Sequence, residues 1–185
     1  MVELLNLDTQ VFQLINSGWS NSFFDFLLPF LRNKYFWFPL YIFIISFLLI
    51  NFKKQGLYII IALSVTVGIA DATSSHLIKK NVQRLRPCKI YKAPNEINLL
   101  VRCGSGYSFP SSHAANHFSM AVFIFLLIGN KNRWIKWGFI FWALAISYSQ
   151  VYVGVHYPLD IICGAVLGSL IASFVYFFYR TYLSK

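Results

Sequence analysis

The chain has 185 residues, of which 57% are hydrophobic, 19% are aromatic and only 12% are charged. Soluble domains are about 45–50% apolar and about 25% charged, so this composition excludes a disordered protein, a disulfide scaffold and almost any ordinary soluble enzyme. Sixteen Lys and Arg residues against six Asp and Glu residues give a net charge of +10. A nucleic-acid-binding protein could share that charge, but it would not carry apolar runs this long. The sequence therefore predicts an integral membrane protein with a single domain, residues 1–185.

The first 32 residues are too polar or too short to cross a membrane. Apolar residues recur there at helical spacing with polar residues between them, at Leu4, Leu7, Val11, Leu14 and Ile15. This pattern predicts an amphipathic helix on the membrane surface. Residues 22–31 are apolar but few, and Pro29 interrupts them, which favours an interfacial or re-entrant segment. A secretory signal opens with basic residues, whereas this chain opens with Glu3 and Asp8, so we expect no cleavage.

Five later stretches are long and apolar enough to cross a bilayer, which takes roughly 20 residues with a range of about 17–25. They are Tyr35–Asn51, Leu57–Ile78, Ser112–Ile128, Trp134–Tyr152 and Pro158–Tyr179. The connection 79–111 is polar and contains three prolines and two glycines, so we expect a loop outside the lipid, which cannot satisfy an irregular backbone. The predicted fold is an all-α membrane protein, a bundle of five transmembrane helices after the interfacial segment 1–32.

Five crossings place the two termini on opposite sides of the membrane. One side holds seven basic residues and no acidic ones: Lys53, Lys54, Lys131, Arg133, Lys136, Arg180 and Lys185. Once the loop 79–111 is set aside, the other side keeps only Arg32 and Lys34. Positive charge in short loops marks the cytoplasmic side. We therefore expect a cytoplasmic C-terminus and a loop 79–111 that faces outward.

Four polar clusters lie at helix ends that face this predicted outer side. In chain order they are Lys79-x6-Arg86-Pro87, Pro110-Ser111-Ser112-His113, Ser149-Gln150 and His156-x3-Asp160. A chain so poor in charge has little reason to gather cations and histidines at the mouths of its helices unless they meet an anion.

The first two clusters have the chemistry of a phosphate site. Lys79 is a point charge and Arg86 a planar fork, and together they can grip two sides of a phosphate. Ser111 and Ser112 stand where a helix begins, and the unpaired N–H groups and the helix dipole there favour an anion. His113 falls in the first turn of that helix, where it can give or take a proton.

The last cluster has the chemistry of a nucleophile. His156 and Asp160 are four residues apart and share a face if the segment is helical. A carboxylate that holds one ring nitrogen fixes the tautomer and leaves the other nitrogen free to attack.

Each cluster alone also has an ordinary structural explanation. His113 can be a polar residue at a helix N-terminus, and His156 with Asp160 can be a structural hydrogen bond. The cations between 79 and 86 can anchor lipid headgroups, which is the more common use of such a run. Only the four clusters together, in order at the mouths of consecutive helices, predict an anion site.

These motifs resemble the type 2 phosphatidic acid phosphatase family, which is related to the vanadium haloperoxidases. The family signature reads K-x6-R-P, P-S-G-H and S-R-x5-H-x3-D, and the likeness extends over nearly the whole chain. The resemblance implies that His156 is the nucleophile that forms a phosphohistidine, that Asp160 orients it and that His113 protonates the leaving group. It also implies that Lys79, Arg86, Ser111 and the backbone near Ser112 hold the phosphoryl oxygens. Because these groups supply the electrostatic stabilisation, no metal or other cofactor is expected.

Two positions depart from the family pattern. Ser112 replaces the usual glycine, a mild change that keeps the backbone donor and adds a hydroxyl. Gln150 replaces the usual arginine, and a neutral amide cannot make the charged two-point contact of a guanidinium. Three explanations stay open: a weakened enzyme, an enzyme with rearranged phosphate contacts, or a chain altered to trap its ligand. The hypothesis drawn from this departure is that Gln150→Arg raises phosphatase activity.

Several other residues are candidates for supporting the site. Cys88 and Cys103 both lie in the loop 79–111, where a disulfide could pin the phosphate-binding segments together in an oxidising compartment, the alternative being two free thiols. Asp71, inside the second crossing, is expected to pair with His76 or with a serine or threonine of its own helix. Ser149 and His117 are also expected near the site, and a satisfied core histidine is the alternative for His117.

The sequence thus predicts a lipid phosphatase of a bacterial inner membrane, with its active site facing the periplasm. The expected substrate is a lipid-linked phosphate that enters sideways from the bilayer, first of all undecaprenyl pyrophosphate. Lipid A and phosphatidylglycerol phosphate are the alternative substrates, and a protein that binds lipid phosphate without turnover is the non-enzymatic alternative. Neither a nucleic acid nor an obligate protein partner is expected.

Overall fold

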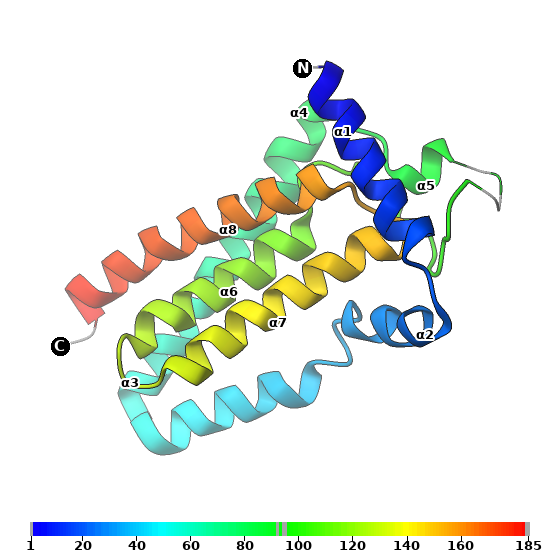
Figure 1. Ribbon diagram of the computed structural model, residues 1–185. Coiled ribbons are helices and arrows are strands. Elements are labelled where there is room, and N and C mark those ends of the chain that lie inside the picture. Colours follow the sequence, from blue (N-terminus) through cyan, green and yellow to red (C-terminus); the bar gives the residue numbers. More distant parts are fainter. Residues whose placement is uncertain (1, 92, 94–95, 184–185) are drawn as a thin grey trace.

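The computed structural model describes residues 2–91, 93 and 96–183, and this part of the chain is helical without any strand (Figure 1). The helices are α1 Val2–Gln13, α2 Ser22–Leu31, α3 Phe38–Ala72, α4 Lys79–Val82, α5 Pro87–Ile90, α6 Ser112–Ile128, α7 Arg133–Tyr152 and α8 Pro158–Phe178. Three π-helical turns, η1 Leu14–Gly18, η2 Thr73–Ile78 and η3 Tyr179–Leu183, continue α1, α3 and α8. The bounds of α6 are the predicted ones, and those of α7 and α8 differ from prediction by one residue.

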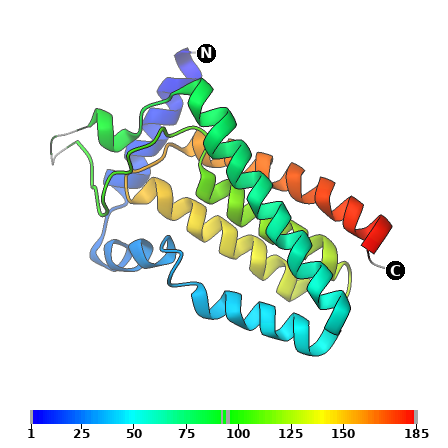
Figure 2. The same cartoon turned by 180° about the vertical axis from the view of Figure 1, so that it is seen from behind.

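Helix α3 is two rods joined by a reversal at Lys53. This residue has φ 48° and ψ −121°, outside the helical region, and the chain turns back there so that the two rods run in opposite directions (Figure 1). The rods approach each other closely, because a Cβ at Gly56 would overlap the carbonyl of Leu48. The reversal lies in the turn predicted between the first two crossings. Seen from behind, the second rod continues through η2 into α4 across the face of α6 (Figure 2).

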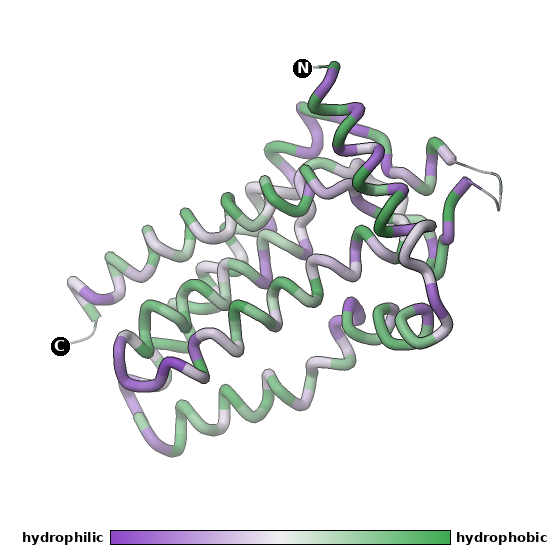
Figure 3. Tube along the Cα trace, viewed as in Figure 1, coloured by the Kyte–Doolittle hydropathy of each residue, from purple (hydrophilic) through white to green (hydrophobic). Residues whose placement is uncertain are grey.

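Two helical stretches of the described residues are long and apolar enough to cross a membrane, Phe38–Val82 and Pro158–Leu183. The first contains the reversal at Lys53 and therefore both rods of α3. Helix α6 is apolar but shorter, at 17 residues, so a bundle of five crossings stays a prediction. Apolar residues dominate the helices, and polar residues gather at the reversal and at the turn between α6 and α7 (Figure 3).

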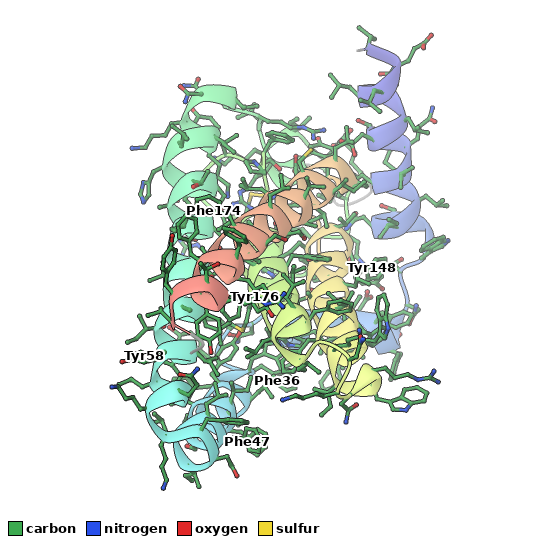
Figure 4. The ribbon with its side chains drawn as sticks, turned by 90° about the vertical axis from the view of Figure 1, so that its left-hand side faces the viewer. Phe36, Phe47, Tyr58, Tyr148, Phe174 and Tyr176 are labelled. Carbon is green, nitrogen blue, oxygen red and sulfur yellow. A yellow bond between two sulfur atoms is a disulfide. The ribbon has the colours of Figure 1, made fainter. Side chains whose placement is uncertain are left out.

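Aromatic side chains cover much of the outer surface of the helices. Phe47 of α3 and Phe174 of α8 are about half exposed or more, at 47% and 64%, and Figure 4 shows them among many rings on the rods. Such a surface suits contact with lipid, because a soluble monomer rarely exposes so much contiguous apolar area.

Helices α6 and α8 also pack with their backbones close together. A Cβ at Gly164 would lie 2.5 Å from the carbonyl oxygen of Ser111, and one at Gly168 would overlap that of Ala115. Small residues four apart let membrane helices approach with their backbones in contact. This contact aligns the N-termini of α6 and α8, the two ends that carry the predicted Ser111 and Asp160.

Helix α1 forms as predicted, and the side that meets the protein carries both polar and apolar residues. Asp8 and Asn16 are buried together with Phe12, whereas Leu4 and Leu7 are more than half exposed. Asn16 donates from Nδ2 to the carbonyl oxygens of Asn98 and Tyr152, at 2.8 and 2.7 Å. The exposed leucines leave an interfacial position open as a prediction, and the buried polar residues fix the segment to the loop and to α7.

The α6–α8 contact predicts that Gly168→Val destabilises the protein, because the side chain would push the two backbones apart. Overpacking of this kind typically costs about 1–3 kcal/mol. Gly68→Val is the matched control, since nothing lies within 4 Å of a Cβ there. Thermal unfolding in detergent should show a lower Tm for Gly168→Val than for Gly68→Val. Equal Tm values would show that the glycine contact is not needed.

Candidate active site

His156 lies in the short connection between α7 and α8 and is 1% exposed. Its Nδ1 is 3.3 Å from Oδ2 of Asp160 and 3.3 Å from Oγ of Ser108, and its Nε2 is 3.2 Å from a terminal nitrogen of Arg86. A guanidinium can only donate hydrogen bonds, so Nε2 is the acceptor and Nδ1 carries the proton. This tautomer leaves the Nε2 lone pair directed at the cations of the site.

Asp160 is fully buried and is held by four donors, two from the loop 79–111 and two from the connection before α8. Its carboxylate accepts from the backbone N–H of Tyr157 at 2.9 Å, from Arg84 at 2.8 Å, from the hydroxyl of Ser108 and from Nδ1 of His156. A carboxylate with this many donors is held ionised and in one position. The predicted contact between Asp160 and His156 is present, and the orienting role of Asp160 stays a prediction.

Arg84 connects the site to the N-terminal helix, a contact that the sequence analysis missed. It donates to Asp8 at 2.6 Å and to Asp160 at 2.8 Å, and it lies over the ring of Tyr157. Asp8 also accepts from the backbone N–H of Leu159 at 2.8 Å. Burial lowers the pKa of Arg84, but Asp160 and Asp8 outweigh it and hold that pKa above its usual value. The only sign of this bridge in the sequence was an acidic residue, Asp8, within the amphipathic pattern of the N-terminal segment.

Burial of the His156 ring favours its uncharged form. Removal from water lowers the pKa of His156 to about 4; the hydrogen bond that His156 donates to Asp160 opposes the shift, and the charge of Arg86 adds to it. The ring is therefore neutral at pH 7, as a nucleophile must be.

Two predicted cations converge on this ring. Arg86 is fixed by its Nε, which donates to the carbonyl of Gly106 at 3.1 Å, and by a terminal nitrogen, which donates to Val155 at 3.2 Å. A Cβ at Gly104 would lie 3.3 Å from the guanidinium carbon, so a small residue is needed there. Lys79 is half-buried and interacts electrostatically with Arg86 and Asp160. The ammonium of Lys79 makes no hydrogen bond with any residue that the structure describes, so it is available to an anion.

The N-terminus of α6 lies against the same region. Ser111 caps the helix, accepts from the N–H of Ala114 at 3.4 Å and donates its own N–H to the carbonyl of Asp160 at 2.9 Å. The hydroxyl of Ser112 is bonded to Ser74 and Ser75 of η2, at 3.0 and 2.9 Å. The hydroxyl added at position 112 therefore holds α6 to the end of α3, and the backbone of Ser112 is what remains for a phosphate.

His113 and His117 lie one above the other on α6. Their rings stack with centroids 6.3 Å apart, and His113 interacts electrostatically with His156 and Lys79. His117 is bonded through Nδ1 to the carbonyl of His113 at 2.7 Å and packs on Trp142 at 4.9 Å. His113 thus faces the site, and His117 supports it from behind.

Three other predicted residues, Asp71, Ser149 and Gln150, have surroundings that the sequence did not indicate. Asp71 accepts from Asn116 of α6 at 3.0 Å, so the prediction that it pairs with His76 or a hydroxyl of its own helix was wrong. The physical reason is that α6 packs on the second rod of α3 and places the amide of Asn116 next to Asp71. The hydroxyl of Ser149 donates to Ile146 of its own helix at 2.6 Å. Gln150 is 1% exposed, and neither its amide nitrogen nor its amide oxygen has a hydrogen-bond partner among the described residues.

Cys88 and Cys103 form a disulfide, with their Cα atoms 5.9 Å apart. The bond joins α5, which follows Arg86, to the loop segment that leads to Ser108 and Ser111. It therefore joins the segments that carry the cations and the helix cap. In contrast, Cys163 of α8 has a free thiol.

A buried histidine held by a carboxylate, near two cations and a helix N-terminus, favours a helical membrane protein with a candidate site for a phosphate-type anion. The family comparison agrees with this class. The model of the PAP2 superfamily matches residues 54–183, and the chain belongs to this superfamily of phosphatases.

Several relatives match nearly the whole chain. A lipid A 4'-phosphatase of Bacteroides thetaiotaomicron is 34% identical over 96% of this chain and 79% of the relative. An undecaprenyl-diphosphatase of Sulfolobus acidocaldarius is 33% identical over 91% of this chain and 76% of the relative. Among solved structures, LpxE of Aquifex aeolicus is 26% identical with a TM-score of 0.68, covering 91% of this chain and 94% of that one. A phosphatidylglycerolphosphate phosphatase of Bacillus subtilis shares the fold, with a TM-score of 0.77 at 18% identity, over 100% of this chain and 90% of that one.

The lowered pKa of His156 predicts the pH at which kcat/KM falls on the acid side of its pH profile. Protonation removes the Nε2 lone pair, so kcat/KM should fall as the pH drops through about 4 rather than near 6.5, the ordinary value for histidine. The ionisation of the substrate's phosphate also changes kcat/KM with pH. Its pKa is measured separately by ³¹P NMR, and the profile is corrected for it. Re-assay at pH 7 after acid exposure controls for unfolding. An acid limb near 6.5 after these corrections would contradict the assigned environment of His156.

Proposed function

We propose that this protein hydrolyses the phosphate of a membrane lipid through a phosphohistidine on His156. The observation that carries the proposal is the fixed tautomer: Asp160 and Ser108 hold Nδ1, while Nε2 faces Arg86. A nucleophile needs an unprotonated atom directed at the phosphorus, and Nε2 is that atom.

The first step transfers the phosphoryl group to the protein. Nε2 of His156 forms a bond to phosphorus, the bond from phosphorus to the lipid oxygen breaks, and that oxygen leaves as the alcohol or, for a diphosphate, as the lipid monophosphate. His113 donates the proton to the leaving oxygen. Arg86 and Lys79 balance the charge on the phosphoryl oxygens, together with the N-terminal amides of α6.

The second step restores the histidine. A water molecule loses a proton to His113 and attacks phosphorus, and the bond between phosphorus and Nε2 breaks to release inorganic phosphate. Asp160 stays ionised throughout and holds the Nδ1 proton. In this account no step needs a metal, because cations and a helix terminus already face the phosphoryl group.

Lipid A carrying a 4'-phosphate is the first substrate to test, because the 34% identical relative that spans nearly the whole chain bears that name. Undecaprenyl pyrophosphate, the substrate favoured by the sequence analysis, is the second candidate, because a 33% identical relative is named for it. For both, we propose a bacterial inner membrane, an active site on the periplasmic side and a cytoplasmic C-terminus. Figure 1 fits this arrangement, since the site and the C-terminus lie at opposite ends of the bundle.

Purified protein in detergent, with chelator present, should release phosphate from at least one of these lipids, and His156→Ala should abolish release. His113→Ala should lower kcat more for a lipid alcohol than for p-nitrophenyl phosphate, whose leaving group needs no proton. Cys163→Ser is the matched control, because this thiol lies in α8 outside the proposed machinery. Binding of the lipid without any release would favour the non-enzymatic alternative. Loss of release on chelation would contradict metal-independent hydrolysis.

A further inference from the structure

Arg32 follows α2 directly and lies beside the connection that carries His156. Leu28 and Leu31 of α2 pack in one cluster with Tyr152, Val153 and Val155, the residues between Gln150 and His156. The indole N–H of Trp37 donates to the carbonyl of Leu31 at 2.7 Å and fixes the chain on the other side of Arg32. The guanidinium is therefore attached to a well-packed segment that touches the active-site turn.

The Arg32 side chain has no partner within the described part of the protein. Its Nε is buried without a hydrogen bond, and the ion pairs between described side chains use Arg84 and His156 instead. Its charge interacts with those of Arg86 and His113, both in the proposed site. A half-buried guanidinium beside another cation is unfavourable unless an anion joins them. Arg32 is thus poised for a negatively charged ligand.

Position 150, in the same region, lacks the positive charge of the family motif. The family motif has an arginine here, but this chain has a buried glutamine whose amide atoms have no partner among the described residues. The backbone carbonyl of Gln150 accepts the N–H groups of Val155 and His156, both at 3.2 Å, so the residue borders the nucleophile directly. The site therefore has a neutral amide without a hydrogen-bond partner at position 150, where the family motif has a positive charge. It also has a guanidinium without an ion-pair partner at position 32, on a neighbouring segment.

We infer that Arg32 is a phosphate-binding residue, whose guanidinium supplies to the phosphoryl group the positive charge that Gln150 lacks. The inference rests on the proposed function and deepens it, because it explains how the site can work without the motif arginine. The departure at position 150 is then a rearrangement of phosphate contacts rather than a loss of one.

The surroundings of Arg32 also fit a phosphate that is attached to a lipid. Leu31, next to Arg32 in the chain, lines an apolar cleft of about 410 Å³ together with Trp37, Leu40 and Trp142. Trp142 contacts His117, which stacks on His113. An acyl chain in this cleft would place its phosphate between Arg32 and the histidines.

The inference is tested first by Arg32→Gln. Losing one preorganised donor at a phosphoryl group should lower kcat/KM for the lipid phosphate by about 10²–10³-fold. Arg32→Lys should recover part of this loss, because it keeps the charge without the planar fork. Lys34→Gln is the matched control: it removes an exposed cation two residues away and should leave kcat/KM near that of the unaltered protein. Equal kinetics for Arg32→Gln and Lys34→Gln would overturn the inference.

A double-mutant cycle tests whether positions 32 and 150 supply the same charge. Gln150→Arg should raise kcat/KM at least tenfold in the Arg32→Gln background, and by a smaller factor in the unaltered protein. An equal factor in the two backgrounds would show that the residues act independently and would contradict the shared role. The Tm of each variant separates a loss of fold from a loss of contact.

Calorimetric titration with inorganic phosphate separates this inference from the proposed function. If no lipid is hydrolysed, weaker phosphate binding by Arg32→Gln still supports Arg32 as a phosphate ligand, and only the proposed function fails. If lipid is hydrolysed while Arg32→Gln changes neither kcat/KM nor phosphate affinity, the inference fails and the proposed function stands.

Discussion

The arrangement of the active site depends on the buried carboxylate of Asp160. One oxygen accepts from Arg84, and the other accepts from Ser108, from a backbone N–H and from His156. Arg84 in turn reaches Asp8 of the N-terminal helix. Removing one member of a buried ion pair typically costs about 3–5 kcal/mol, because the remaining charge is left without a partner. This one carboxylate therefore links the N-terminal helix, the loop 79–111, the active-site turn and α8.

The same carboxylate sets the chemistry of the site. With the proton of His156 held on Nδ1, the other ring nitrogen is the only one that can attack. In the proposed mechanism, burial keeps the ring neutral at pH 7, and Arg86 and Lys79 provide the charge that a phosphoryl group requires. The hydrogen bonds by which Asp160 holds the segments together are thus the same ones by which it orients His156 in the proposed mechanism. The glycine contact between α6 and α8 then brings the cap at Ser111 to within hydrogen-bonding distance of the Asp160 backbone.

The helices and the motif residues could be predicted from the sequence, because both are encoded locally. Apolar runs form the rods, and His156 and Asp160 are close in the sequence. They do not share the helical face that the sequence analysis considered, because α8 begins at Pro158 and His156 reaches Asp160 from the connection before it. The contacts of Arg84 could not be predicted, since Asp8 and Asp160 each lie 76 residues away from it and an irregular loop carries Ser108. Pairing across helices was equally hidden, and for this reason Asp71 was assigned to its own helix rather than to Asn116.

The N-terminal segment shows the limit of reading periodicity alone. Its apolar spacing predicted a helix, and the helix is there, but periodicity could not tell which face meets the protein. Two polar residues on that face, Asp8 and Asn16, make the specific contacts. Arg32 was hidden for a related reason, because it appeared only as a charge in a short connection until the packing of α2 brought it close enough to interact with Arg86 and His113.

The most direct test of this account is to trap the phosphorylated protein. The lipid substrate is mixed with the enzyme, the reaction is quenched in alkali, where phosphohistidine survives, and the modified residue is located by mass spectrometry. The account predicts phosphate on His156, and ³¹P NMR of the quenched protein should assign it to Nε2. Phosphate on another residue, or on Nδ1 of His156, would contradict the tautomer on which the account rests.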